Sequence, residues 1–148
     1  MRPRESQTPG ENATMDTIEA RLNQFQPQML SIFRIMFGLL ILQHACAKWF
    51  GFPVPGPAGV SVTSLIGWAG IIELVFGSLV TVGLFTRLAA FILAGEMAFA
   101  YFMGHFPRGW TPMGNAGSLA TAYCFAFLLL VFFGGGAWSL DAMLRKKT

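Results

Sequence analysis

Residues 29–50, MLSIFRIMFGLLILQHACAKWF, form the segment that decides the fold class. A helix needs about 20 mostly apolar residues to cross a hydrocarbon core of about 30 Å, and this segment is long enough. Its apolar run is followed by Gln43, His44, Cys46 and Lys48. Because polar and charged groups are costly in lipid, the segment predicts a membrane helix that carries a candidate polar site.

Three further apolar segments of similar length follow, at about residues 62–84, 86–104 and 116–136. Only a short turn with the sequence LFTR separates the second and third segments, so we expect them to form a tight antiparallel hairpin. Two loops rich in Pro and Gly break the remaining helices. The sequence therefore predicts an all-α fold, an integral membrane bundle of four transmembrane helices.

The composition favours the same class of protein. Hydrophobic residues make up 54% of the chain and charged residues 11%, whereas soluble domains carry about 25% charged residues. A soluble helical protein would need a polar shell, for which four such segments leave little chain. The alternating pattern of an outer-membrane barrel is missing. No run of Lys and Arg is interleaved with aromatic residues, which argues against nucleic acid as a partner.

We expect three regions along the chain. Residues 1–28 form a polar leader, partly disordered, with room for a short amphipathic helix at 16–26. The transmembrane domain covers residues 29–143, and residues 144–148 form a basic tail. The leader lacks the apolar core of a signal peptide, and either Met1 or Met15 could be the true start.

The distribution of Lys and Arg predicts the orientation of the chain. With four spans, both termini and the turn between the second and third spans lie on one side of the membrane. Most of the basic residues fall on that side: Arg2, Arg4, Arg21, Arg87, Arg145, Lys146 and Lys147. The opposite side carries Lys48 and Arg108. Since cytoplasmic flanks are enriched in Lys and Arg, both termini are expected in the cytoplasm.

Ionisable residues within the spans are functional candidates by default. At 100° per residue, Arg34, His44 and Lys48 share an arc of roughly 80° on the first helix. Gly38 and Ala45 keep this face narrow. The first span thus presents a basic face to a neighbouring helix.

Glu73 is the expected partner of this basic face. It shares one side of the second span with Gly70 and Gly77, and small residues let helices approach closely in lipid. Its predicted height lies between those of Arg34 and His44, so either cation could reach it. The preferred pair is Arg34–Glu73, with His44 and Lys48 above it. Glu96 on the third span could face the same centre or another subunit.

Structural roles remain open for the same residues. A buried ion pair can hold helices in register without further function. Lys48 could extend to the outer interface, and His44 could make a hydrogen bond between helices. His44 lacks a second His or Cys on its face, so no metal site is predicted.

Several motifs together resemble the DoxX family of small four-helix bacterial membrane proteins. They are FRIMFGLLILQHACAKWFGFP, GWAGIIELVFGSLVTVGLFTRLAA, HFPRGW and GGGAWSLDAM, and the likeness covers about residues 30–143. The resemblance implies a multi-pass protein of the cytoplasmic (inner) membrane. Some relatives are named as subunits of a thiosulfate:quinone oxidoreductase, and others are linked to thiol balance. Carried over by position, the polar set of the family is Arg34, His44, Lys48, Glu73 and Arg87.

The chain departs from the family near its fourth span. Similar proteins read NGGELA where this chain reads NAGSLA from Asn115 to Ala120, so Ser118 replaces a carboxylate. If that acid supplies a proton or balances Lys48 in relatives, this chain has lost it. The secondary site candidates are Arg87 from the family set, Glu96 from the third span, and Asn115 and Ser118 from this segment.

Three functions remain open. The first is a membrane subunit or partner of a quinone- or thiol-linked redox system, catalytic or not, which docks a redox protein or binds quinone beside His44, Lys48 and Glu73. The second is a scaffold or assembly protein whose intramembrane ion pairs are structural. The third is a permeation module for ions or small solutes, which would need a homo-oligomer. No cofactor other than quinone is indicated.

Overall fold

The computed structural model describes residues 9–56 and 60–146, with side-chain surroundings from Met15 onward. All regular structure within these ranges is helical. Five α-helices and two short irregular turns follow in the order α1 Pro9–Phe50, α2 Leu65–Val82, α3 Thr86–Ala100, the π-helical turn η1 Tyr101–His105, the 3₁₀ turn η2 Phe106–Arg108, α4 Ser118–Phe133 and α5 Leu140–Arg145. The predicted all-α class is confirmed.

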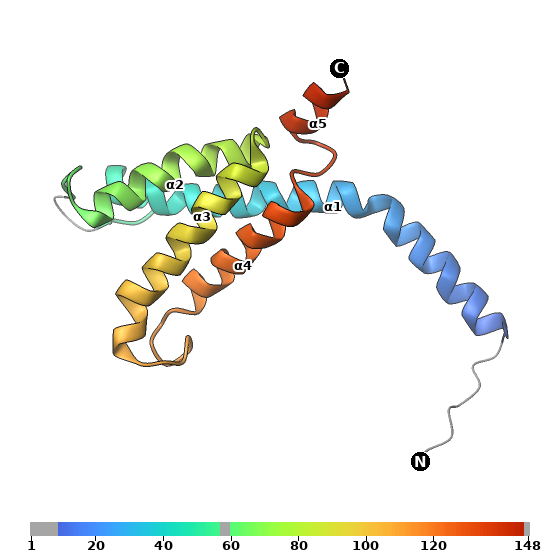
Figure 1. The fold of residues 1–148 in the computed structure, drawn as a ribbon, viewed down its shortest axis with the longest axis horizontal. Coiled ribbons are helices and arrows are strands. Elements are labelled where there is room, and N and C mark those ends of the chain that lie inside the picture. The colour runs from blue at the N-terminus through green and yellow to red at the C-terminus, as the bar shows by residue number, and fades with distance from the viewer. Residues whose placement is uncertain (1–8, 57–59, 147–148) are drawn as a thin grey trace, which may run out of the picture.

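The helices form two arms (Figure 1). In one arm α1 packs along α2, and in the other α3 packs along α4. The turn between α2 and α3 is tight, as predicted, and Gly83 adopts a left-handed φ of 74° there. Beyond this turn α2 and α3 diverge, although they still contact each other. The predicted hairpin is therefore a junction between two helix pairs, because each of its helices packs mainly on another partner.

Close packing of α1 on α2 depends on two glycines. A Cβ atom added to Gly77 would lie 2.9 Å from Cγ2 of Ile41, and one added to Gly38 would lie 3.0 Å from Cα of Thr81. Real Cβ atoms rarely approach other heavy atoms so closely. The predicted small-residue faces of the first two spans are confirmed, and Glu73 is buried on the same face of α2.

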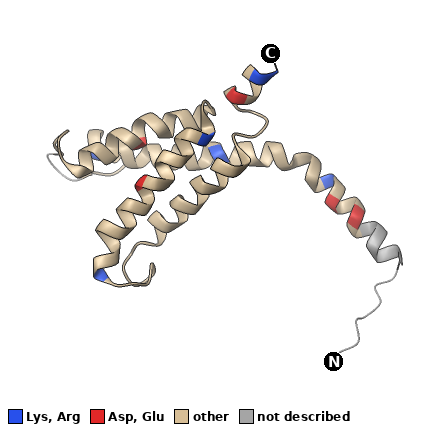
Figure 2. Cartoon of the chain, viewed as in Figure 1, with Lys and Arg blue, Asp and Glu red and all other residues tan. Residues whose placement is uncertain are grey.

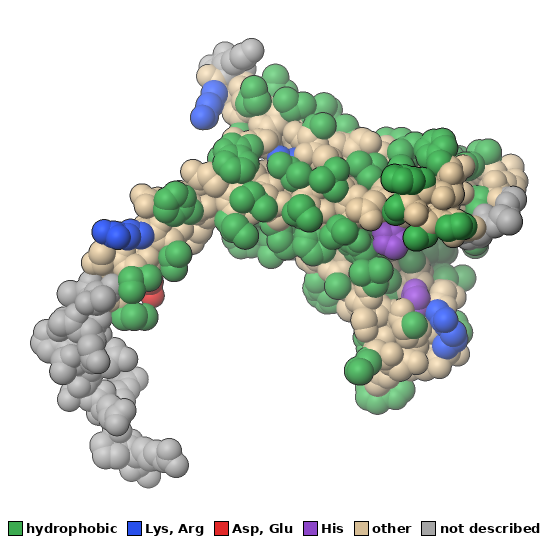
Figure 3. All heavy atoms as spheres, turned by 180° about the vertical axis from the view of Figure 1, so that it is seen from behind, with side chains coloured by type: hydrophobic (Ala, Val, Ile, Leu, Met, Phe, Trp, Pro, Cys, Tyr) green, Lys and Arg blue, Asp and Glu red, His purple; other side chains and the backbone are tan. Residues whose placement is uncertain are grey.

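The surface of the described chain is that of a multi-pass membrane protein. Residues Met15–Phe50, Leu65–Val82 and Thr86–Arg108 are each long and apolar enough to cross a bilayer. The protein buries only 28% of the most apolar stretch in each of them. Apolar side chains cover the face shown in Figure 3. Apolar surface this extensive indicates contact with lipid.

α4 is shorter than the predicted span. It covers Ser118–Phe133, which is 16 residues and about 24 Å of helix, whereas the sequence predicted 116–136. The helix ends at Gly134, whose φ of 82° breaks the helical geometry. The glycines that looked like part of the span therefore terminate it.

α1 runs without interruption through most of the predicted leader. It includes residues 9–14, where disorder was expected, and absorbs the short helix predicted at 16–26. Residues 1–8 lie outside the described part of the chain. Pro27 lies inside α1, and the helix bends as its N-terminal part leaves the bundle. The division into leader and transmembrane domain stays a prediction.

Candidate functional site

Arg34 is buried among backbone carbonyl groups. Its guanidinium donates to four carbonyl oxygens, those of Gly135 (2.8 Å), Trp138 (3.0 Å), Val80 (2.6 Å) and Thr81. The carbonyls of Val80 and Thr81 belong to the last turn of α2, where carbonyl groups lack the usual helical partner. The oxygen of Val80 also accepts from the N–H of Gly83 at 3.1 Å. A planar guanidinium with five donors suits such a cluster. The predicted Arg34–Glu73 pair is therefore wrong.

Glu73 pairs with Lys48 instead. The Lys48 Nζ lies 2.6 Å from Oε2 of Glu73, whose side chain is 3% exposed, while that of Lys48 is 20% exposed. α2 begins at Leu65 rather than 62, which places Glu73 only about 12 Å from the start of the helix. The long side chain of Lys48 extends along the helices to reach the carboxylate of Glu73. The basic face of α1 thus divides into two separate sites.

A cleft of about 330 Å³ lies between the two arms beside this ion pair. Each of the four long helices and the π-helical turn contribute to it. Its polar and aromatic lining consists of His44, Lys48, Glu73, His105 and Tyr123, and its apolar lining includes Ile41, Met97, Ala100, Leu119 and Ala120. His44 is exposed, and both histidines of the chain are visible in Figure 3. The cleft therefore combines a buried charge pair with an opening to the surroundings.

Two aromatic side chains form one wall of the cleft. The imidazole of His44 and the ring of Tyr123 meet edge to face, with centroids 5.7 Å apart and planes at 89°. Tyr123 is buried and stacks on Phe127 at 6.0 Å. This contact holds the cleft side of α4 against the exposed histidine of α1.

His105 reaches the cleft from the π-helical turn. This turn widens the helix after α3, and such turns often occur at functional sites. Nδ1 of His105 lies 3.2 Å from the Asn115 carbonyl oxygen and 2.8 Å from Nη2 of Arg108. Neither His105 nor Tyr123 is among the site residues predicted from the sequence. Tyr123 could have been selected because it is a polar aromatic residue in an otherwise apolar segment. His105 could not, because a regular helical pattern in the sequence does not indicate a π-helical turn.

Glu96 lies on α3 and does not line the cleft. Both of its carboxylate oxygens are shielded from solvent and have no hydrogen-bond partner among the described residues. The expectation that Glu96 faces either the common centre or another subunit stays a prediction.

The other secondary candidates lie elsewhere. Asn115 is buried and organises the loop before α4, donating to the carbonyl oxygen of Gly109 and accepting from the N–H of Gly117. Ser118 is exposed at the first residue of α4. Arg87 lies at the start of α3, away from the cleft. None of these three side chains lines the cleft.

The sequence of this chain matches a known family of proteins. The model of the family described as DoxX matches residues 29–106. The chain belongs to the DoxX family. The matched region includes every cleft residue of this DoxX protein that lies on α1, α2, α3 or the π-helical turn, whereas α4 lies outside it.

Two relatives extend the match over nearly the whole chain. An uncharacterized protein of Haemophilus influenzae is 40% identical over 131 residues, which is 85% of this chain and 98% of the relative. An uncharacterized membrane protein of Mycobacterium tuberculosis is 28% identical over 139 residues, covering 82% of this chain and 84% of the relative. No solved structure matches the chain.

Proposed function

We propose that the chain crosses the bacterial inner membrane four times, with α4 as the fourth span and both termini in the cytoplasm. α4 is apolar, and the bilayer can thin locally to match a short helix. The cationic Arg87 and Arg145 line one pocket at the junction end of the molecule. Figure 2 shows how few other charges the arms carry. An excess of basic residues at this end supports a cytoplasmic location.

We further propose that the protein is the membrane subunit of a redox system and binds a quinone head group in the cleft. The observation that carries this proposal is the cleft itself, in which the Lys48–Glu73 pair meets His44 and Tyr123 beside apolar helix surfaces. Its volume of about 330 Å³ lies in the range of small-molecule pockets.

The chemistry of a quinone matches this lining. Its two carbonyl oxygens need hydrogen-bond donors, which the ammonium of Lys48 and the hydroxyl of Tyr123 supply. Its flat ring packs against the imidazole of His44, and its apolar tail lies along the lipid-facing helices. Reduction to the quinol consumes two electrons and two protons. A docked redox partner protein supplies the electrons, and His44 and Glu73 are placed to pass protons.

A titration of the purified protein with a short-chain quinone tests the proposal. We expect saturable binding that weakens about tenfold in His44→Ala and in Tyr123→Phe, since each loses one contact of about 1.4 kcal/mol. Gln43→Ala is the matched control, because Gln43 is exposed beside His44 and does not line the cleft. Absence of saturable binding, or equal affinity in all three folded variants, would contradict the proposal.

A scaffold function is the second candidate. The carbonyl cluster around Arg34 favours it, since that arrangement fixes α1 to α2 and to the segment before α5 without leaving an open site. If the Lys48–Glu73 pair serves the same purpose, Glu73→Gln should lower folding yield with no separate loss of quinone binding. A folded Glu73→Gln protein that loses quinone binding would exclude a purely structural role for the pair.

A further inference from the structure

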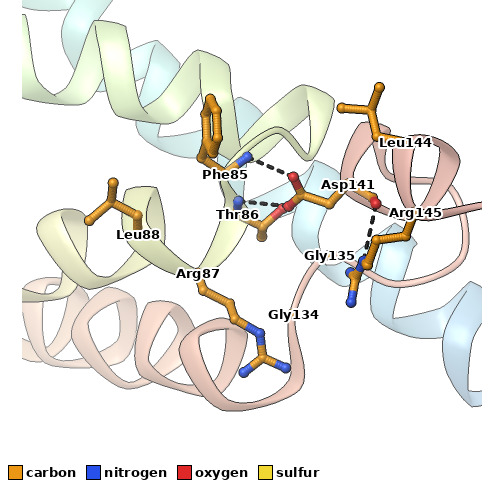
Figure 4. Close-up of a pocket in the computed structure, with 9 residues that line it drawn as sticks. All are labelled: Phe85, Thr86, Arg87, Leu88, Gly134, Gly135, Asp141, Leu144 and Arg145. Carbon is orange, nitrogen blue, oxygen red and sulfur yellow. Dashed lines mark hydrogen bonds between the residues drawn. The ribbon is translucent and has the colours of Figure 1, made fainter. Parts of the chain in front are cut away.

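A second cavity, of about 440 Å³, lies at the junction end of the molecule. It is bounded by the first turn of α3, the end of α4 and the short helix α5, and Figure 4 shows its lining. Two arginines enter it from different elements, Arg87 from α3 and Arg145 from α5, with Gly134 and Gly135 between them. The quinone cleft shares none of these residues.

Hydrogen bonds fix the guanidinium of Arg87 in place but do not use all of its donor groups. Nη1 donates to the carbonyl oxygens of Val131 (2.7 Å) and Phe132 (2.9 Å), which are unpaired at the end of α4. Its Nε and Nη2 atoms have no hydrogen-bond partner in the described part of the chain. Two donor groups are therefore held at the cavity with an unused capacity for an acceptor.

Arg145 lies across the cavity on α5. Its Nε donates to the main-chain carbonyl oxygen of Asp141 at 3.1 Å, which holds the side chain back along the helix. Lys146 follows directly and does not line the cavity. The guanidiniums of Arg87 and Arg145 thus form two sides of one basic site (Figure 4).

The one carboxylate in the cavity wall offsets only part of the charge of the two arginines. Oδ1 of Asp141 accepts from the main-chain N–H of Phe85, and Oδ2 accepts from that of Thr86, both at 2.8 Å. Asp141 is directed at the start of α3, as Figure 4 shows. The cavity keeps a net positive charge and favours an anion.

The rim of the cavity is apolar. The side chains of Phe85, Leu88 and Leu144 line it and are 64%, 60% and 56% exposed. A site for a soluble anion would gain nothing from such a rim. At the end of membrane helices, basic groups can bind the anionic head group of a lipid, and exposed apolar side chains beside them can contact its acyl chains.

We propose that this cavity binds an anionic phospholipid, with its phosphate between Arg87 and Arg145 and its acyl chains along Leu88 on the outer face of α3. Arginine pairs with phosphate oxygens through parallel hydrogen bonds, which suits the open donors of Arg87. The lipid joins α3, α4 and α5 at the end where the two arms meet. This site is independent of the quinone proposal.

Lipid binding to the purified protein tests the assignment. Native mass spectrometry in detergent compares phosphatidylglycerol with phosphatidylcholine of the same acyl chains. We expect the wild type to prefer phosphatidylglycerol, and Arg145→Gln to weaken that binding about tenfold while phosphatidylcholine binding stays unchanged. Arg87→Gln should act in the same direction. Lys146→Gln is the matched control, because it removes the same charge from the neighbouring position.

Two results would overturn the proposal. One is wild-type affinity for phosphatidylglycerol in Arg145→Gln, or an equal loss in Lys146→Gln, which would indicate only a diffuse basic surface. The other is displacement of phosphatidylglycerol by millimolar inorganic phosphate, which would mark a soluble-anion site. Arg87→Gln could fail to fold because α4 loses the side chain that caps its end. Arg145→Gln still tests the proposal in that case, since the side chain of Arg145 is exposed.

Discussion

Helix α1 carries two cations that face the bundle, and the protein surrounds them in opposite ways. Arg34 is 1% exposed and is enclosed by carbonyl groups from α2 and from the segment before α5. Lys48 has a single carboxylate partner and remains partly exposed at the edge of a cleft. One cation is saturated with fixed acceptors, and the other retains hydrogen-bonding capacity beside an open space.

This difference separates a structural site from a functional candidate. Four carbonyls around one guanidinium bind parts of the chain far apart in sequence and leave no room for a ligand. The Lys48–Glu73 pair is accompanied in the cleft by the exposed His44 and by Tyr123. The ammonium of Lys48 has three donor hydrogens and a single carboxylate partner, so it can donate to a further group in the cleft.

Replacement of Arg34 should have the largest effect on stability. Arg34→Leu removes the side-chain donor from the carbonyl oxygens of Gly135, Trp138 and Thr81, at a cost of about 1–3 kcal/mol for each one that stays buried. The oxygen of Val80 keeps the N–H of Gly83. We expect almost no folded protein by size-exclusion chromatography in detergent. Arg34→Lys should recover part of the yield, because one ammonium reaches fewer of the carbonyls. A thermal midpoint for Arg34→Leu equal to that of the wild type would contradict a structural role for Arg34.

Removal of Lys48 alone should have the next largest effect. Lys48→Met leaves the Glu73 carboxylate buried without a cation, and broken buried pairs cost about 3–5 kcal/mol; the partial exposure of Lys48 favours the low end. The double variant Lys48→Met/Glu73→Gln should regain most of this stability. Denaturant titration of the single and double variants measures the coupling. Additive losses would show that the pair contributes little.

Glu96→Gln should leave stability unchanged or raise it slightly. The wild-type carboxylate has no hydrogen-bond partner among the described residues, and an amide of the same shape needs no counter-ion. Thermal unfolding of this variant is compared with Glu73→Gln, which loses an ion pair. If Glu96→Gln lowered the thermal midpoint as much as Glu73→Gln does, Glu96 would have a stabilising role that the structure does not show.

The smallest expected effect depends on pH and lies outside the spans. Partial burial raises the pKa of Asp141, but hydrogen bonds from Thr86 and Phe85 and the charge of Arg145 outweigh it, so the pKa lies below its ordinary 3.8. A lowered folded-state pKa stabilises the protein above the unfolded value, and this stability is lost as pH falls through the folded pKa.

Asp141→Asn should therefore be less stable than the wild type near neutral pH, and the difference should shrink once the pH falls below 3.8. The thermal midpoints of both proteins between about pH 7 and pH 3 measure this change. A difference that does not depend on pH would show that the charge of Asp141 is unimportant for capping α3.

The sequence predicted the helices well and their arrangement less well. Apolar length identified α1, α2 and α3, and the small residues Gly38 and Gly77 identified the faces on which α1 and α2 pack. The glycines after Phe133 are apolar enough to resemble a span but end α4. The divergence of the two arms depends on which helices pack best, which no local pattern encodes.

Of the predicted polar residues, His44, Lys48 and Glu73 line the cleft, whereas the pairing of Lys48 with Glu73 was not predicted. A helical wheel gives the angle of Arg34 and Lys48 but not which acceptors stand opposite each of them. The carbonyls of Gly135 and Trp138 reach Arg34 from a distant turn of the chain. His105 depends on a π-helical turn that a regular period cannot reveal.

The most direct test of the contrast between the two cations uses the folded double variant Lys48→Met/Glu73→Gln. Its thermal midpoint and its affinity for a short-chain quinone are measured on the same preparation, beside the wild type and Gln43→Ala. We predict a midpoint close to that of the wild type together with quinone affinity reduced at least about tenfold. A double variant that folds and binds quinone as the wild type does would contradict a functional role for the Lys48–Glu73 pair. The pair would then serve only to pack α1 against α2.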